Sequence, residues 1–278
     1  MQDLFIIEMP YKIIFTDIDG TLLNQDRELS ELTINVFQEL QKEVPVVLIS
    51  SRMPQAMRHL QKQLQIEHQP LICYNGGLVL VDGKEVSSTE IPMPILVELF
   101  RFNENIKCHL SLYHNEDWYV PSMDFWALRE ENNTKVTPMV ASSQEVLEKW
   151  KSEKKGAHKI MCMGEEAHID AIVSFLEEDF GEYLHLYRSK PTYVEIANKK
   201  VSKLTAINIL LKDVFSLDLK EAIAYGDNYN DYEMLKAVGM GIAVGNAKPE
   251  ILEIAKEITF HGKEDGVARS LQKLFNLS

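Results

Sequence analysis

The sequence predicts an α/β fold: a doubly wound, mostly parallel sheet with an α+β module inserted into it. Short apolar runs rich in β-branched residues alternate with segments of helical spacing towards both ends of the chain. These runs are continuously apolar, which is typical of strands that helices cover on both faces. Between residues 84 and 195 the pattern changes to a hairpin, further strands and more aromatic side chains, which indicates an insertion.

The first part of the core, residues 1–83, is predicted to alternate strands and helices. Its β-branched runs have the length of strands, and LSELTINVFQELQKE between two of them has the apolar spacing of an amphipathic helix. The run LICYNGGLVLV ends at the turn signal Asp82-Gly83. In chain order, the predicted elements are a strand at 11–16, a helix within 29–43, a strand at 44–50, a helix at 55–64 and an apolar strand run at 71–81.

The insert, residues 84–195, is predicted to contain two helical segments and several strands. HLSLYHNEDWYV, residues 109–120, has the pattern of a β-hairpin. The other predicted elements are a strand at 159–164, a helix at 167–179 and strands at 183–189 and 191–196. We expect the aromatic side chains of the insert to form its core or its packing onto the rest of the chain. These side chains are Trp118, Tyr119, Phe125 and Trp126.

The second part of the core, residues 196–278, returns to the pattern of the first. Its predicted elements are a helix at 202–213, a strand at 221–227, a helix at 231–238 and a short strand at 240–245. The core is therefore expected to consist of two chain segments on either side of the insert.

The composition excludes several classes of partner. The formal charge is −13, from 42 acidic against 29 basic residues, and no long Lys/Arg run offers a track for a nucleic-acid backbone or an anionic membrane. No apolar run approaches the roughly 20 residues of a membrane helix, and the N-terminus, MQDLFIIEMPYK, lacks the features of a signal peptide. A cytoplasmic protein is expected, with Cys73, Cys108 and Cys162 as buried thiols.

Polar side chains follow four of the predicted core strands. Asp17 and Asp19 come at the end of the first strand, where residues two apart point to the same side. Ligand sites of open α/β sheets form at the carboxyl edge of the strands, so these polar endings should converge on one crevice. The other three are Ser50-Ser51-Arg52, Asn75-Gly76-Gly77 and the segment GDNYND at 226–231.

Clustered carboxylates with a hydroxyl and a lysine favour phosphoryl chemistry. Carboxylates alone repel an anionic substrate, whereas Mg²⁺ takes oxygen ligands from one or two carboxylates and a substrate phosphate. One aspartate can then attack phosphorus, while its neighbour protonates the leaving oxygen and later activates water. If the Asp-Gly pair is considered alone, it can also be explained without any function, as a polar turn that follows a strand.

The motif DIDGT, residues 17–21, resembles the first motif of the haloacid dehalogenase (HAD) superfamily of phosphatases. The order of the later motifs is similar to the Cof-type branch, and the similarity spans the whole core. It implies a Rossmann-like core with a type IIB α/β cap inserted between the second and third motifs. It further implies a Mg²⁺-dependent phosphomonoester hydrolase that acts through an aspartyl-phosphate on a small metabolite, such as a sugar phosphate, pyridoxal phosphate or FMN.

The resemblance also implies roles for single residues. Asp17 falls on the nucleophile and Asp19 on the general acid/base, and Lys203 on the lysine that offsets charge at the nucleophile. The metal would be held by Asp17, the Asp19 carbonyl, Asp227 and Asp231, the last of these as a ligand through water or as a support. Phosphate or substrate contacts fall on Ser50, Ser51, Arg52, Asn75, Gly76 and Asn230, and Asn246 would lie near the phosphate or the leaving group.

Two positions depart from the family pattern. The second motif commonly runs Thr-Gly-Arg and here is Ser50-Ser51-Arg52, and Lys200 replaces a glycine that often stands three residues before the lysine. Two other functions stay open: a phosphotransferase or phosphomutase with the same nucleophile, and a catalytically silent phosphate-binding protein. For Asp231 an N-cap of the following helix is the structural alternative, and for Asn75 and Asn246 it is a turn.

Overall fold

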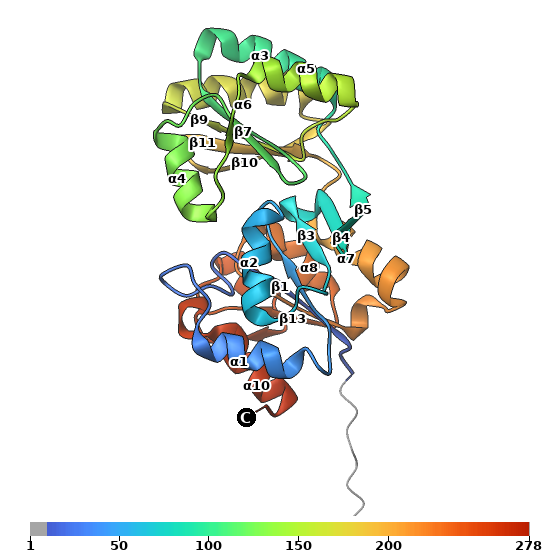
Figure 1. The fold of residues 1–278 in the computed structure, drawn as a ribbon. Helices are drawn as coiled ribbons and strands as arrows, with labels where there is room; N and C mark the ends of the chain where they lie inside the picture. The colour runs from blue at the N-terminus through green and yellow to red at the C-terminus, as the bar shows by residue number, and fades with distance from the viewer. Residues whose placement is uncertain (1–9, 278) are drawn as a thin grey trace, which may run out of the picture.

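The computed structural model describes residues 10–277, except for the side chain of Ser189. Residues 1–9 lie outside that range. They form most of the N-terminal segment in which the sequence shows no signal-peptide features. The chain forms two bodies, a core and a cap, each built on its own sheet (Figure 1). Strands from both ends of the sequence share the core sheet, so the cap is an insertion, as predicted.

The core sheet is mostly parallel, as predicted. Its six strands from β14 to β3 run parallel, whereas β4 and β5 are antiparallel additions at one edge. The strand order is β14 (Glu257–Ile258), β13 (Met240–Ala243), β12 (Ala222–Gly226), β1 (Ile13–Asp17), β2 (Val46–Ile49), β3 (Leu71–Cys73), β4 (Leu78–Val81) and β5 (Lys84–Ser88).

Helices cover both faces of this sheet, which explains the continuously apolar strands. In β1, Ile14 points into one apolar cluster, while Ile13 and Phe15 point into the other. One face carries α1 (Glu31–Leu40), α2 (Gln55–Leu64) and α10 (Gly266–Phe275). The opposite face carries α7 (Lys203–Leu210), which continues into a π-helical turn (Leu211–Phe215), α8 (Tyr232–Ala237) and α9 (Pro249–Ile254).

The cap sheet has one face towards the core and one covered by helices (Figure 1). Its order is β10 (Leu184–Lys190), β11 (Tyr193–Asn198), β9 (Lys159–Met163), β6 (His109–His114), β7 (Asp117–Val120) and β8 (Met139–Val140). The outer helices are α3 (Met93–Ile106), α5 (Ser143–Glu153) and α6 (Glu166–Phe180). A fourth helix, α4 (Phe125–Thr134), extends from the sheet towards the core.

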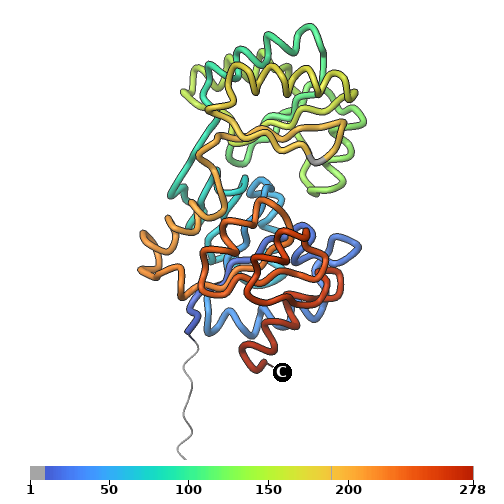
Figure 2. Tube along the Cα trace, turned by 180° about the vertical axis from the view of Figure 1, so that it is seen from behind, coloured from blue at the N-terminus to red at the C-terminus, as the bar shows by residue number. Residues whose placement is uncertain are grey.

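Two chain segments connect the bodies, and they run side by side in both views (Figures 1 and 2). The outgoing connection follows β5 and the returning one follows β11. The Asn198 side chain donates a hydrogen bond of 2.8 Å to the Glu90 carbonyl, which ties the two connections together.

The structure corrects several predicted details. The cap contains four helices, whereas two helical segments were predicted. Helices α4 and α5 bury few residues, so the sequence shows no strong apolar pattern where they form. The run at 71–81 is a β3–β4 hairpin, and β5 extends the core sheet beyond residue 83, where the insert was expected to begin. The last cap strand continues to Asn198, past the predicted boundary at 195. Phe125 is 68% exposed, so it is not part of the cap core.

Other predictions agree with the structure. The three cysteines are free thiols and are buried. Trp118 and Tyr119 are buried in the cap. Every helix within residues 10–277 is too short or too polar to cross a lipid bilayer.

A matched pair of phenylalanines in the cap tests the assignment of its apolar core. Phe100 is 8% exposed and packs in the cluster beneath α3, α5 and α6, whereas Phe125 is 68% exposed. Phe100→Ala should lower the free energy of unfolding by about 3 kcal/mol because it leaves a cavity. Phe125→Ala should change it by less than about 0.5 kcal/mol. Urea denaturation of both variants measures this, and equal losses would contradict the assignment.

Candidate active site

The predicted polar strand ends meet at one edge of the core sheet. Asp17 is the last residue of β1, and Gly226 is the last residue of the neighbouring strand β12. Ser50 follows β2, which flanks β1 on its other side. Because these strands are parallel, their carboxyl ends lie at the same edge, and the loops that follow them form the candidate site.

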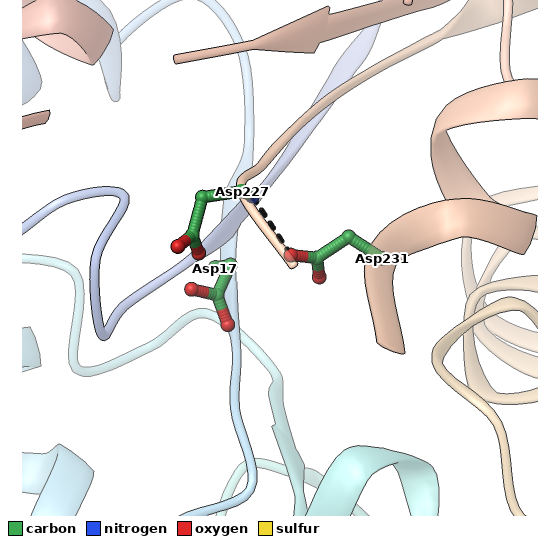
Figure 3. Close-up of side chains that lie close together, drawn as sticks. All are labelled: Asp17, Asp227 and Asp231. Atoms are coloured by element: carbon green, nitrogen blue, oxygen red, sulfur yellow. Dashed lines mark hydrogen bonds between the residues drawn. The ribbon is translucent and has the colours of Figure 1, made fainter. Parts of the chain in front are cut away.

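Three carboxylates lie together at this edge. One oxygen from each of Asp17, Asp227 and Asp231 lies within 4.8 Å of the other two (Figure 3). Thr21 donates a hydrogen bond of 3.0 Å to Asp227 Oδ1. Gly20 has φ +90°, and a Cβ there would lie 2.5 Å from Asp227 Oδ2, so the DIDGT loop needs glycine at this position.

A buried lysine joins two of the carboxylates. Lys203 Nζ lies 2.5 Å from Asp17 Oδ1 and 2.6 Å from Asp231 Oδ1, and its side chain has no exposed surface. Lys203 is the first residue of α7, whose preceding residue Ser202 caps the helix. Gly76 brings this helix close, since a Cβ at Gly76 would lie 2.4 Å from the Ser202 carbonyl oxygen.

The pKa values of these groups reflect burial and crowding. Burial raises the pKa of Asp17 well above its usual value; Lys203 opposes this shift, and Asp231 and Asp227 add to it. Burial, followed by the charge of Asp231, raises the pKa of Asp227 to about 6. For Lys203, burial lowers the pKa, but Asp17 and Asp231 outweigh burial and raise the pKa above its usual value.

Asp231 stabilises the arrangement of its neighbours. Its Oδ2 accepts the backbone N–H of Asp227 at 2.9 Å, drawn as the dashed line in Figure 3, and that of Asn228 at 3.0 Å. Its Oδ1 accepts from Lys203. Asp231 stands at the N-cap position of α8, but its side chain makes no capping bond to that helix, so the side-chain cap offered as its alternative is absent.

Asp19 stands outside the group of three carboxylates and binds two arginines. Arg52 donates through Nε and Nη2 to the two Asp19 oxygens, both at 2.7 Å, and Arg27 Nη2 donates at 2.8 Å. Burial raises the pKa of Asp19, but the hydrogen bonds and charges of Arg52 and Arg27 outweigh this and lower the pKa below its usual value. Arg52 is thus a partner of Asp19, and Arg27 is a site residue that the motifs did not indicate.

The second motif lies between the first strand and the cap. Ser50 is buried, and its hydroxyl accepts the Arg52 backbone N–H at 3.2 Å. The Ser51 carbonyl accepts a 2.8 Å hydrogen bond from Lys159 of the cap strand β9. This contact joins the core to the cap at the residue that departs from the family pattern.

The predicted asparagines form a chain from the core to the cap. Asn230 donates to the Asn75 side-chain oxygen at 3.0 Å, and Asn75 donates to Glu195 of β11 at 3.4 Å. Asn75 has φ +57°, so it also makes the turn that was its alternative. Asn246 instead braces the DIDGT loop, because it donates to the Gly20 carbonyl at 2.8 Å.

A cavity of about 290 Å³ separates the core edge from the cap. Asp19, Ser51 and Arg52 line it from the core, and Lys159 and Glu195 are among the residues that line it from the cap. Burial raises the pKa of Glu195, and Lys159, 3.8 Å away, opposes this shift. One sequence signal could have indicated these cap residues: Lys159 is a charged residue at the start of an otherwise apolar strand.

Comparison with known proteins agrees with this geometry. A sequence model of the haloacid dehalogenase-like hydrolases matches residues 14–271. A Haemophilus influenzae protein named "Putative phosphatase" is 33% identical over 271 residues, which are 96% of this chain and 99% of the relative. The 5-amino-6-(5-phospho-D-ribitylamino)uracil phosphatase YitU of Bacillus subtilis is 28% identical over 274 residues, 96% of this chain and 98% of the relative.

The fold has close counterparts among solved structures. The crystal structure of a haloacid dehalogenase-like hydrolase from Bacteroides thetaiotaomicron superposes with a TM-score of 0.87 at 24% identity. The match covers 95% of this chain and 100% of that chain, so it includes both the core and the cap. Together, these matches show that the chain belongs to the Cof-type phosphatases of the haloacid dehalogenase superfamily.

Proposed function

We propose that this phosphatase is a Mg²⁺-dependent phosphomonoester hydrolase with Asp17 as its nucleophile. The observation that supports this most directly is the contact of buried Lys203 with Asp17 and Asp231, beside Asp227. A nucleophilic carboxylate must stay ionised, and an adjacent buried ammonium favours the ionised form. Asp17 also lies at the carboxyl edge of the sheet, two residues before Asp19, which lines the cavity.

The carboxylate cluster suits a hard divalent cation. At full ionisation, three carboxylates against one ammonium leave an excess of two negative charges in a buried site. Asp17 and Asp227 would hold Mg²⁺ together with the Asp19 carbonyl, while Asp231 would support them through Lys203 and the Asp227 backbone. When bound, Mg²⁺ would stabilise negative charge on the phosphoryl oxygens.

The proposed reaction has two displacements. In the first, an Asp17 oxygen bonds to phosphorus and the bond to the leaving oxygen breaks, with Asp19 supplying the proton that this oxygen takes up. In the second, water attacks the aspartyl-phosphate, Asp19 accepts the proton from that water, and Asp17 is regenerated. Ser50 would bind the phosphoryl group, with Ser51, Gly76, Asn75 and Asn230 around it.

Arg27 and Arg52 would favour Asp19 as the base of the second step and oppose it as the acid of the first step. Their hydrogen bonds favour the carboxylate, which suits the base of the second step. The acid of the first step needs a proton on the same oxygens, so part of this contact must open when the substrate binds. Arg27 is the more exposed of the two arginines, and it also contacts Asn133 of the cap at 3.3 Å, so cap movement would loosen it first.

A small phosphorylated metabolite is the proposed substrate. The relative YitU is named for such a compound, a phosphorylated ribitylamino-uracil. Sugar phosphates, pyridoxal phosphate and FMN are the first compounds to test, and the cavity of about 290 Å³ suits a molecule of modest size. The cytoplasmic location stays a prediction from the sequence.

Substitution of the two aspartates tests the proposed roles. Asp17→Asn should abolish phosphate release because the amide is a poor nucleophile, and Asp19→Asn should nearly abolish it. Phosphate release from the compounds named above, with Mg²⁺ or EDTA, measures this. Asp213→Asn, at an exposed position, is the matched control and should retain full activity. Substantial turnover by folded Asp17→Asn protein would refute the nucleophile, and turnover in EDTA would refute the metal requirement.

Replacement of the buried lysine should make stability depend on pH. Lys203→Met leaves Asp17 and Asp231 without their cation, which should cost about 3–5 kcal/mol of unfolding free energy near neutral pH. A carboxyl whose folded pKa is raised destabilises the fold above that pKa, and the penalty is lost as pH falls through it. Loss of the ammonium should raise the pKa of Asp17 further, because Lys203 opposes the upward shift, so the deficit relative to wild type should shrink between neutral and acidic pH.

Urea denaturation in EDTA at both pH values measures this deficit. The exposed Lys212→Met is the control, and its effect should be small and independent of pH. A Lys203→Met deficit that stays constant or grows on acidification would contradict the buried charge cluster.

A further inference from the structure

The cavity between core and cap is positively charged, although the chain as a whole carries a formal charge of −13. Five of its lining residues are cationic and three are acidic. The cations are Arg27, Arg52, Arg129, Lys159 and Lys190, and the acids are Asp19, Glu130 and Glu195. Such an excess in a cleft attracts anions and repels cations.

Three of the five cations already have protein partners. Arg27 and Arg52 share the Asp19 carboxylate. Lys159 binds the Ser51 carbonyl and faces Glu195. These contacts account for two of the three acids, and the third, Glu130, accepts a hydrogen bond from Asn133 at 3.4 Å.

Arg129 and Lys190 have no such partner. Within the described part of the chain, no carboxylate oxygen lies within 4.0 Å of either side chain's charged nitrogens. Both instead flank the ring of Tyr193, with Arg129 Cζ 5.7 Å and Lys190 Nζ 5.6 Å from its centroid. Tyr193 lies opposite Lys190 in the β10–β11 hairpin, whereas Arg129 comes from α4.

The fold positions these two elements against each other. Asp124 caps α4, accepting the backbone N–H groups of Trp126 and Ala127, and it lies 2.8 Å from the buried His109 of β6. This anchors the helix that carries Arg129 to the cap sheet. The two charges are therefore held on the cap side of a cavity that Asp19, Ser51 and Arg52 line from the core.

We propose that the leaving group of the substrate carries a negative charge of its own, which Arg129 and Lys190 bind beside Tyr193. A carboxylate or a second phosphate would supply the partner that these cations lack, through charge-assisted hydrogen bonds. A neutral leaving group would offer neither cation a partner and would leave the half-buried Arg129 and the exposed Lys190 to solvent. This inference rests on the proposed function. It narrows the proposed substrates to metabolites that carry a second anionic group besides the phosphate that is removed.

Matched phosphate esters test the inference on the full-length protein with Mg²⁺. For a carboxylate, phenyl phosphate is compared with 4-carboxyphenyl phosphate; for a second phosphate, fructose 6-phosphate is compared with fructose 1,6-bisphosphate. The value of kcat/KM should be at least about tenfold higher for the anionic member of one pair, mostly through a lower KM. The pair that shows the preference identifies the anion.

Substitution of the two cations should remove the preference. In Arg129→Gln/Lys190→Gln, the kcat/KM ratio within the responding pair should fall about tenfold. The control is Arg269→Gln/Lys236→Gln, because these side chains also lie over aromatic rings, Phe260 and Tyr232, but outside the cavity. In the control, the ratio should equal that of the wild type.

The outcomes separate this inference from the proposed function. Equal hydrolysis of both members of each pair by the wild type would overturn the inference and leave the phosphatase intact. A preference that persists in the Arg129→Gln/Lys190→Gln protein would also overturn it. Absence of phosphate release from all four compounds and from the earlier panel would refute the proposed function, and the leaving-group site with it.

Discussion

The interaction on which the site depends is the contact of a buried ammonium with two buried carboxylates. Lys203, Asp17 and Asp231 come from α7, β1 and the segment before α8, so their contact requires three separate elements to pack in register. Taking these charges out of water is costly, and the cost is offset only while all three groups remain in place. The charge balance of the site therefore depends on the correct packing of the core sheet, and the packing depends in turn on that charge balance.

In the proposed function, chemistry and recognition lie on different parts of the chain. The core supplies the carboxylates, the lysine and the second motif, all at the ends of strands whose positions the sheet fixes. The cap supplies Arg129, Lys159, Lys190 and Glu195, which line the same cavity from three strands and a helix. Substitutions on the cap surface would then change which leaving groups are accepted without disturbing the carboxylate cluster. This division is consistent with a fold that serves many substrates.

The sequence predicted the core site better than the cap. Parallel strands align their carboxyl ends, so residues at or just after strand ends, such as Asp17 and Asp227, could be brought together from strand positions alone. The role of Asp231 depended on where its side chain points, and the local pattern left open a helix cap that this side chain does not make for α8. In the cap, Ala127 is the only buried residue of α4, so the sequence there lacks the regular spacing of apolar residues that predicts a helix. Arg129 reaches the cavity through tertiary packing, which single-sequence patterns do not encode.

The insertion of the cap also has a consequence for how the chain folds. The central strands β1 and β12 pair directly, yet the whole cap lies between them in sequence. During synthesis the cap sequence emerges complete before β12 exists, so its sheet can form while β1 still lacks a neighbour on that side. The core must then close a loop that the folded cap has already shortened, which lowers the entropy cost of the long-range pairing. The cap thus has a second use, as a folded bridge that brings distant strands together.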